Sequence, residues 1–378
     1  MSTKRSRRRN DSSKNSAQPP LLAHEVATRS GVRATTDFPA KHKIEVARLW
    51  LDAGVVPVLG RRRVRGRRPA VLVEVPAEYA GKIIEPPVLG MEAVTARKVK
   101  RINADKLSSG FYPAHLPLRY APRLLEKARP PKKIRYGADI PNSVFAPDTR
   151  YIFRDTSFPW CTTGRVDTAG GVCTGTMIGR RLMLTGSHCI QWTSTGAGWV
   201  KFTPSYYNGS EPFGVAWATR VIYWARADGS DGLSDQETAF DYVVLVLDRN
   251  LGDVTGYPGY RTYSSSWNGG SYWQQIGYPG DLSSSQRPAF FGGGSIESVQ
   301  SKSTSGQTGS VLGHFMDTSG GHSGGPYWGW WDGEPWPRLV GVDSTSPATP
   351  GSGTTGDNEA GGGPALSSLI AYARANYP

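Results

Sequence analysis

Three short stretches of the chain carry side chains that could together perform nucleophilic chemistry. They are "TGSHC" with His188, "AFDYVVLVL" with Asp241 and "GGHSGGP" with Ser323. A serine hydroxyl becomes a good nucleophile only when a base takes its proton, and that base works best when a third group orients it. Each stretch also has a simpler explanation by itself. Serine between glycines, for example, is ordinary loop chemistry.

The surroundings of His188 and Asp241 favour the chemical interpretation. Cys173 and Cys189 bracket a strand, a turn and a second strand, and His188 directly precedes Cys189. A bridge between the two cysteines would fix the backbone of the imidazole and would be worth roughly 3 kcal/mol in the chain-entropy model. Asp241 stands at the entry to an apolar run, where a carboxylate is sheltered but ionised. The alternatives are a packed or exposed imidazole and the last exposed position before a buried strand.

Short strands must position these side chains. From residue 143 onward, apolar or alternating runs recur between Gly, Ser, Asn and Pro, which is typical of an all-β sandwich or barrel. In the last segment, "PALSSLIAYARANYP", apolar residues fall on one helical face and Pro364 stands near the start, so a C-terminal helix is expected. The aromatic stretch at 327–337 predicts a hairpin around its "DG" turn.

The charge divides the chain into two parts. Residues 1–142 hold 30 Lys and Arg against 12 Asp and Glu, a balance of +18, whereas residues 143–378 hold 14 against 19, a balance of −5. The overall charge of +13 therefore belongs to the first part. We call residues 1–142 the first unit and residues 143–378 the second unit.

The first unit is expected to contain mixed elements. Residues 1–20 are polar and Ser-rich and are predicted to be disordered. A helix is predicted over 41–54 and a strand over 69–76. Residues 127–137 have the Pro-rich, dibasic composition of an exposed linker.

Composition also excludes several classes. The chain has no run of about 18 apolar residues, so no membrane helix is expected. Its three cysteines show no spacing of zinc ligands, and neither a metal nor an organic cofactor is implied. The basic N-terminus lacks the apolar stretch of a signal peptide, which leaves another export route, a different start or an intracellular protein as alternatives.

The three motifs in the order His, Asp, Ser resemble the chymotrypsin-like serine endopeptidases, and most closely their glutamyl-endopeptidase-like branch of bacteria and fungi. The resemblance covers about residues 143–378 and includes "VFAPDTRYIFRDTSFPWCTTGRV" at 144–166. It implies two antiparallel six-stranded β-barrels with a C-terminal helix. The first barrel would span 143–255 and the second 256–378, preceded by the tail 1–20 and a basic mixed α/β pro-segment and linker over 21–142.

The same resemblance assigns roles. It makes His188 the general base, Asp241 its orienting group and Ser323 the nucleophile, in a cleft between the barrels. The backbone amides of Gly321 and Ser323 would form the oxyanion hole, where a glycine lets the amide face the cleft. Peptide bonds of polypeptide substrates would be hydrolysed through an acyl-enzyme.

Five positions depart from the pattern or leave it open. His322 replaces the aspartate that receives the new amine in trypsin-like members, so activation should differ, and the ring should point away from the cleft. Asp317 and Thr318 fall where the substrate pocket begins. Asp343 aligns with the histidine that selects glutamate, so its carboxylate should favour basic or mixed residues over Glu. A turn-capping role for Asp343 is the alternative. Cys161 could be a small buried residue, a free thiol or half of a bridge to another chain.

The first unit is expected to be a pro-segment that inhibits the second unit and is removed near Lys132–Lys133 or Ser143. The opposite charges of the two units would favour this docking. A nucleic-acid-binding module using Arg61 to Arg68 is the rival, but that run lacks interleaved aromatics and any groove-reading motif. A catalytically silent binding protein is the third hypothesis. The active protein is expected to be a secreted monomer.

Overall fold

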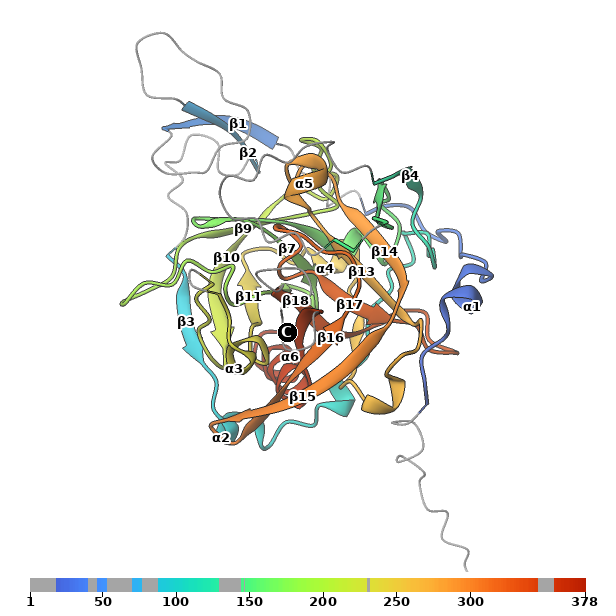
Figure 1. Ribbon diagram of the computed structural model, residues 1–378. Helices are drawn as coiled ribbons and strands as arrows, with labels where there is room; N and C mark the ends of the chain where they lie inside the picture. Colours follow the sequence, from blue (N-terminus) through green and yellow to red (C-terminus); the bar gives the residue numbers. More distant parts are fainter. Residues whose placement is uncertain are drawn as a thin grey trace, which may run out of the picture.

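The computed structural model describes residues 18–39, 46–52, 70–76, 88–128, 144–145, 147–229, 232–345 and 357–378. The predicted tail up to residue 17, the Arg61–Arg68 run and the Lys132–Lys133 pair lie outside these residues. As predicted, strands dominate the second unit (Figure 1). None of the helices in the described ranges is long and apolar enough to cross a membrane.

The first sheet is a closed antiparallel barrel of six strands. Its order is β11-β8-β7-β6-β9-β10, and pairing between β10 and β11 closes the ring. Four of the six strands, β7, β8, β10 and β11, coincide with predicted apolar runs, whereas β6 and β9 do not. The core contains Val166, Phe202 and Leu245. The six strands are β6 (Thr163–Thr168), β7 (Gly171–Met177), β8 (Leu182–Thr185), β9 (Val200–Pro204), β10 (Ala216–Tyr223) and β11 (Val243–Leu247).

The second sheet is larger than the expected six strands. Its order is β15-β16-β19-β18-β17-β13-β14-β5-β4, with β12 paired to β18. Eight of its ten strands lie within the predicted region 256–378, and the other two, β4 and β5, precede the first barrel in the chain. The strands are β4 (Leu124–Lys127), β5 (Tyr151–Phe153), β12 (Gly259–Tyr260), β13 (Trp273–Gly277), β14 (Ala289–Gly294), β15 (Ile296–Thr304), β16 (Gln307–His314), β17 (Pro326–Gly329), β18 (Arg338–Thr345) and β19 (Asn358–Gly362). The predicted aromatic hairpin is confirmed as β17 and β18.

The C-terminal helix lies where the two sheets share a core. It is α6 (Pro364–Asn376), and its predicted apolar face is buried at Leu366, Leu369 and Ile370. These side chains pack in one cluster with residues of both sheets, such as Val244 and Val342. Figure 1 shows α6 near the middle of the view. The other helices are short: α1 (Ala23–Ala27), α2 (Ala96–Val99), α3 (Asp235–Thr238), α4 (Gly252–Thr255), α5 (Gly280–Ser283) and the 3-10 turns Asp105–Leu107, Trp160–Thr162 and Ser265–Trp267.

The prediction of a helix over 41–54 is wrong. The structure has a strand there, β1 (Val46–Asp52), which pairs antiparallel with β2 (Ala70–Pro76). The second strand agrees with the predicted strand at 69–76. The apolar residues of 41–54 have mixed spacings without a clear 3.6-residue period, so a partner strand could satisfy the backbone equally well.

The other described parts of the first unit, residues 18–39 and 88–128, pack against the second unit. β3 (Gly90–Ala93) runs parallel to β10 and adds a seventh strand to the first sheet, as Figure 1 shows. β4 pairs with β5 at the end of the second sheet. Leu89, Leu116 and Leu118 are at most 5% exposed and belong to the same clusters as residues of the second unit.

Candidate active site

His188 and Asp241 meet as predicted. His188 lies in the turn that follows β8, and Asp241 lies two residues before β11, the neighbour of β8. The ring Nδ1 of His188 is 2.6 Å from Asp241 Oδ2, and the backbone N–H of His188 donates to Asp241 Oδ1 at 2.8 Å. The side chain of Asp241 is fully buried, whereas that of His188 is 16% exposed. Asp241 therefore holds one side of the imidazole, and another side is partly exposed to solvent.

A third donor, Ser344, completes the environment of Asp241. Its hydroxyl donates to Asp241 Oδ2 at 2.5 Å. Burial raises the pKa of Asp241, but the His188 imidazole and these hydrogen bonds outweigh burial and lower it, so the carboxylate stays ionised. Burial lowers the pKa of His188, and the carboxylate again outweighs it and raises the pKa above the ordinary value. Ser344 was not predicted, because only the folded strand β18 brings it to Asp241.

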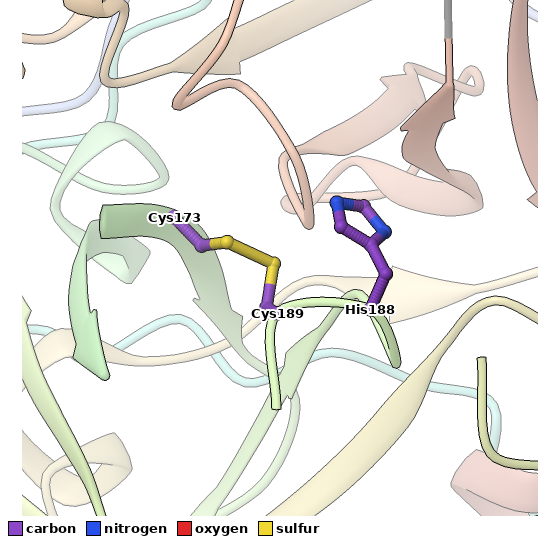
Figure 2. A group of neighbouring side chains, drawn as sticks. All are labelled: Cys173, His188 and Cys189. Carbon is purple, nitrogen blue, oxygen red and sulfur yellow. A yellow bond between two sulfur atoms is a disulfide. The ribbon is translucent and has the colours of Figure 1, made fainter. Parts of the chain in front are cut away.

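The predicted disulfide is confirmed. Cys173 on β7 is bonded to Cys189, and the bridge lies beside the imidazole of His188, as Figure 2 shows. These three residues are the one group of metal-ligand types that cluster within the described ranges. Because the two sulfurs are bonded to each other, they are not free thiolates for a metal.

The turn that carries Ser323 packs against the turn that carries His188. The Ser323 carbonyl accepts a hydrogen bond from Thr174 N–H at 2.8 Å, and the Cys189 sulfur lies 3.7 Å from it. A Cβ on Gly324 would lie only 2.2 Å from Thr185 Oγ1, so only glycine fits this close contact. Among the hydrogen bonds of the described residues, none joins the Ser323 hydroxyl to the His188 ring.

Two backbone amides of the turn, those of Gly321 and Ser323, are the predicted oxyanion donors. In the part of the chain that the structure describes, the N–H groups of Gly321 and Ser323 donate to no protein acceptor. Gly321 has a φ of 100°, and a Cβ there would lie 2.2 Å from the Tyr278 carbonyl oxygen. Thr174 fixes this conformation because its hydroxyl donates to the Gly321 carbonyl at 2.7 Å.

Asp317 and Thr318 are buried in the structure. Asp317 is 2% exposed, and its two oxygens accept hydrogen bonds from the Phe145 and Thr149 amides at 2.8 and 2.9 Å. The Thr149 hydroxyl donates to the same carboxylate. Burial raises the pKa of Asp317 despite these donors. The Asp317 carboxylate thus holds the segment 145–149.

Asp343 is the predicted specificity residue and lies close to the His188–Asp241 pair. It is 5% exposed on β18, and the Tyr327 hydroxyl donates to its Oδ1 at 2.5 Å. Burial, helped by the neighbouring Asp241, raises the pKa of Asp343 to about 7, although Tyr327 and His188 act in the opposite direction. A carboxyl with this pKa is partly protonated near neutral pH.

His322 and Cys161 stand apart from the reactive groups. The His322 ring is fully buried, and its Nδ1 lies 3.0 Å from the Ser319 amide nitrogen, which agrees with the expectation that it points away. Cys161 is fully buried, and its thiol donates to the Thr255 carbonyl at 3.2 Å. Cys161 is thus a small buried residue with a free thiol. Burial raises the pKa of this thiol well above its usual range.

The sequence comparisons find two Bacillus proteins whose names are those of proteases. No family model matches the chain. Over 203 residues, or 53% of this chain and 59% of the relative, the chain is 29% identical to the glutamyl endopeptidase of Bacillus licheniformis. Over 155 residues, or 37% of this chain and 46% of the relative, it is 28% identical to a Bacillus subtilis protein named extracellular metalloprotease. The chain spans about half the length of these curated relatives.

Among solved structures, a Glu endopeptidase in complex with MPD aligns with 62% of this chain and all of its own, at 21% identity and a TM-score of 0.49. The sequence similarity to the Bacillus licheniformis glutamyl endopeptidase confirms the resemblance to that protease which the three motifs predicted.

Proposed function

We propose that the protein is a serine-type endopeptidase in which His188, Asp241 and Ser323 act as a triad. The observation that carries this proposal is the buried Asp241 carboxylate bonded to His188 Nδ1 at 2.6 Å, next to the turn of Ser323. Asp241 orients the ring and stabilises the imidazolium that forms when Nε2 takes the hydroxyl proton. No metal or organic cofactor is needed for this chemistry.

The reaction would proceed in two halves. Ser323 Oγ attacks the scissile carbonyl while His188 accepts its proton, and the same proton then passes to the leaving amine. Water repeats the sequence on the acyl-enzyme and releases the acid. The amides of Gly321 and Ser323, which are free of protein acceptors in the described chain, would stabilise the developing oxyanion. One such donor is worth about 2.7–4 kcal/mol in related enzymes.

Variants of the three residues test the proposal. With labelled casein as substrate, Ser323→Ala and His188→Ala should abolish hydrolysis, and Asp241→Asn should lower kcat by about 10⁴ because the wrong tautomer is held. Ser301→Ala, on the exposed face of β15, is the matched control. Thermal melting must show that all variants fold. Parent-like hydrolysis by folded Ser323→Ala would refute the triad.

The two alternatives predict different results. A catalytically silent binding protein would neither hydrolyse casein nor react with a fluorophosphonate. A nucleic-acid-binding protein would bind DNA or RNA in a salt-sensitive way that disappears when Arg61–Arg68 are neutralised. The ordered Asp241–His188 pair favours the enzyme, because a silent protein has no need for a buried carboxylate that orients an imidazole.

The packing of the first unit predicts whether it stays bound to the second unit after cleavage. A cut between residues 129 and 143 would separate the first unit from the second. However, β3 would remain hydrogen-bonded to β10, and Leu116 and Leu118 would remain in a shared core. We therefore expect the cut chain to stay together. Both pieces should co-elute in gel filtration after cleavage at Lys132–Lys133, and separate elution would contradict this.

The inhibitory role of the first unit, as an intramolecular partner, stays a prediction. It is tested by comparing fluorophosphonate labelling of intact and cut protein. An inhibitory segment requires faster labelling after the cut. Equal rates would mean that residues 88–128 are a structural part of an enzyme that is active before cleavage.

The compartment and the substrate preference are proposals of the same kind. A disulfide beside the catalytic base is stable in an oxidising environment, which favours secretion. A carboxyl at Asp343 would favour Lys or Arg over Glu at the scissile residue. We expect a monomer that acts on polypeptides. Cleavage of a peptide library that varies this residue tests the preference, and a clear selection of Glu would refute it.

A further inference from the structure

A second buried ionic group lies outside the triad and next to the nucleophile turn. Its centre is Arg150, whose side chain is completely buried. Taking a guanidinium out of water is costly unless it is paired and fully hydrogen-bonded. The triad chemistry does not use this residue.

The partners of Arg150 come from its own segment and from a distant loop. Asp148 accepts from Arg150 Nε at 3.1 Å and from one terminal nitrogen at 2.9 Å. Asp281 in α5 is paired with that same nitrogen at 2.6 Å and with the other at 3.3 Å. The side chains of both aspartates are at most 4% exposed. Burial lowers the pKa of Arg150, but the two carboxylates outweigh burial and raise it, so the cation is retained.

Ser319 connects this ionic group to the oxyanion turn. Its hydroxyl donates to Asp281 Oδ1 at 2.6 Å and accepts from Arg150 at 3.1 Å. The next carbonyl along the chain, that of Gly320, accepts from the Gly280 amide at 2.8 Å. The residue after Gly320 is Gly321, whose amide is the proposed oxyanion donor. The start of the nucleophile turn is thus tied to α5 at two consecutive residues.

The same segment holds the turn at a second point. Asp317, two residues before Ser319, binds the amides of Phe145 and Thr149. Phe145, Thr149 and Arg150 therefore contact the 317–319 segment at both of its ends. The residue at 322, where trypsin-like members have an aspartate, is an uncharged, buried imidazole that makes no ion pair in the described chain. The ionic contact that orders this turn must come from elsewhere.

We propose that Arg150 is a positioning residue that holds the oxyanion turn in its catalytic conformation through Asp281 and Ser319. The inference rests on the proposed function, because it assigns the turn to transition-state binding. Arg150 touches neither substrate nor the reacting atoms. It acts through the loop that sets the direction of the Gly321 amide. Arg150 also comes just after the proposed maturation region, so docking of its segment would order that loop.

The test compares Arg150→Met with Arg180→Met. Arg180 also forms a paired contact with an aspartate, Asp253, at 2.9 Å, but its side chain is 53% exposed and lies away from the turn. Arg150→Lys keeps the charge but loses the fork geometry. Ser319→Ala removes only the link between the ion pair and the turn and serves if Arg150→Met does not fold, as judged by its melting curve.

Two readouts separate positioning from mere support of the fold. The first is the ratio of affinities for a peptide aldehyde, which forms a tetrahedral adduct, and the matching unreactive amide. In Arg150→Met we expect aldehyde affinity, kcat and the fluorophosphonate labelling rate to fall by about 10²–10³, the effect of losing one oxyanion donor, with little change in KM or amide affinity. Arg150→Lys should recover part of this loss, and Arg180→Met should match the parent.

The second readout needs no activity. Hydrogen exchange of the peptide that carries residues 319–325 should become faster in Arg150→Met and Ser319→Ala but not in Arg180→Met. Parent-like labelling and parent-like exchange in both variants would overturn the inference. A parent protein that fails to react with the fluorophosphonate would instead refute the proposed function, while the exchange result would still decide whether Arg150 orders the turn.

Discussion

Arg374 offers the sharpest test of whether the first unit is part of the folded body. Its guanidinium, on the last turn of α6, donates to four carbonyl oxygens from separate parts of the chain. Two acceptors belong to the first unit: the Leu107 oxygen at 2.5 Å and the Ser109 oxygen at 2.6 Å. The others are the oxygens of Ile178 at 2.5 Å and Pro258 at 3.0 Å. One side chain thus joins the first unit, the barrel and the C-terminal helix.

Replacing Arg374 with methionine keeps much of the apolar stem but removes all four donors. The Ser109 contact is exposed, so water can replace it, whereas the other three contacts are partly buried. At about 1 kcal/mol for each partly buried carbonyl left without its donor, the free energy of unfolding should fall by about 3 kcal/mol. Cation–π contacts with Tyr257 and Tyr260, 5.0 and 5.1 Å away, would add to this loss.

Urea unfolding followed by tryptophan fluorescence measures this change. The matched control is Arg226→Met, because Arg226 also stacks on aromatic rings, Trp192 and Tyr223, but is exposed. The control should change the free energy of unfolding by less than about 1 kcal/mol. If Arg374→Met is as stable as the control, the hydrogen bonds of Arg374 do not join the first unit to the second unit.

Three further predictions concern the site. The kcat/KM should rise with pH through the pKa of His188, which is raised above the ordinary 6.5, because only the neutral ring accepts the proton. In initial-rate profiles, Asp241→Asn should shift this inflection to lower pH. Reduction of the Cys173–Cys189 bridge, which closes a separation of 16 residues, should lower the free energy of unfolding by roughly 3 kcal/mol in urea titrations, and an unchanged curve would contradict its structural role. The preference for Lys or Arg over Glu should increase as pH rises through about 7 and Asp343 ionises, and Asp343→Asn should reduce it by about tenfold in a peptide library and remove its pH dependence.

Local motifs account for the parts of the site that could be predicted. His188, Asp241 and Ser323 each stand in a recognisable short stretch, and Cys189 follows His188 directly. The apolar runs that became strands, and the periodic face of α6, were equally local. Such signals need no knowledge of which segments are neighbours in space.

The missed residues owe their roles to contacts between distant segments. Ser344 reaches Asp241 across 103 residues, and Arg150 reaches Asp281 across 131. No spacing in the sequence predicts such contacts. The way in which the first unit packs could not be predicted for a similar reason. Its charge suggested that it docks on the second unit, but charge does not reveal that β3 pairs with β10 through backbone hydrogen bonds.

The most direct test of the central claim is to find where a fluorophosphonate binds. The protein should be treated with the probe at neutral pH, digested and mapped by mass spectrometry, with Ser323→Ala and His188→Ala treated in parallel. The account predicts one adduct per chain, on Ser323, that is absent from both variants. An adduct on another residue, or equal labelling of the His188→Ala protein, would contradict it.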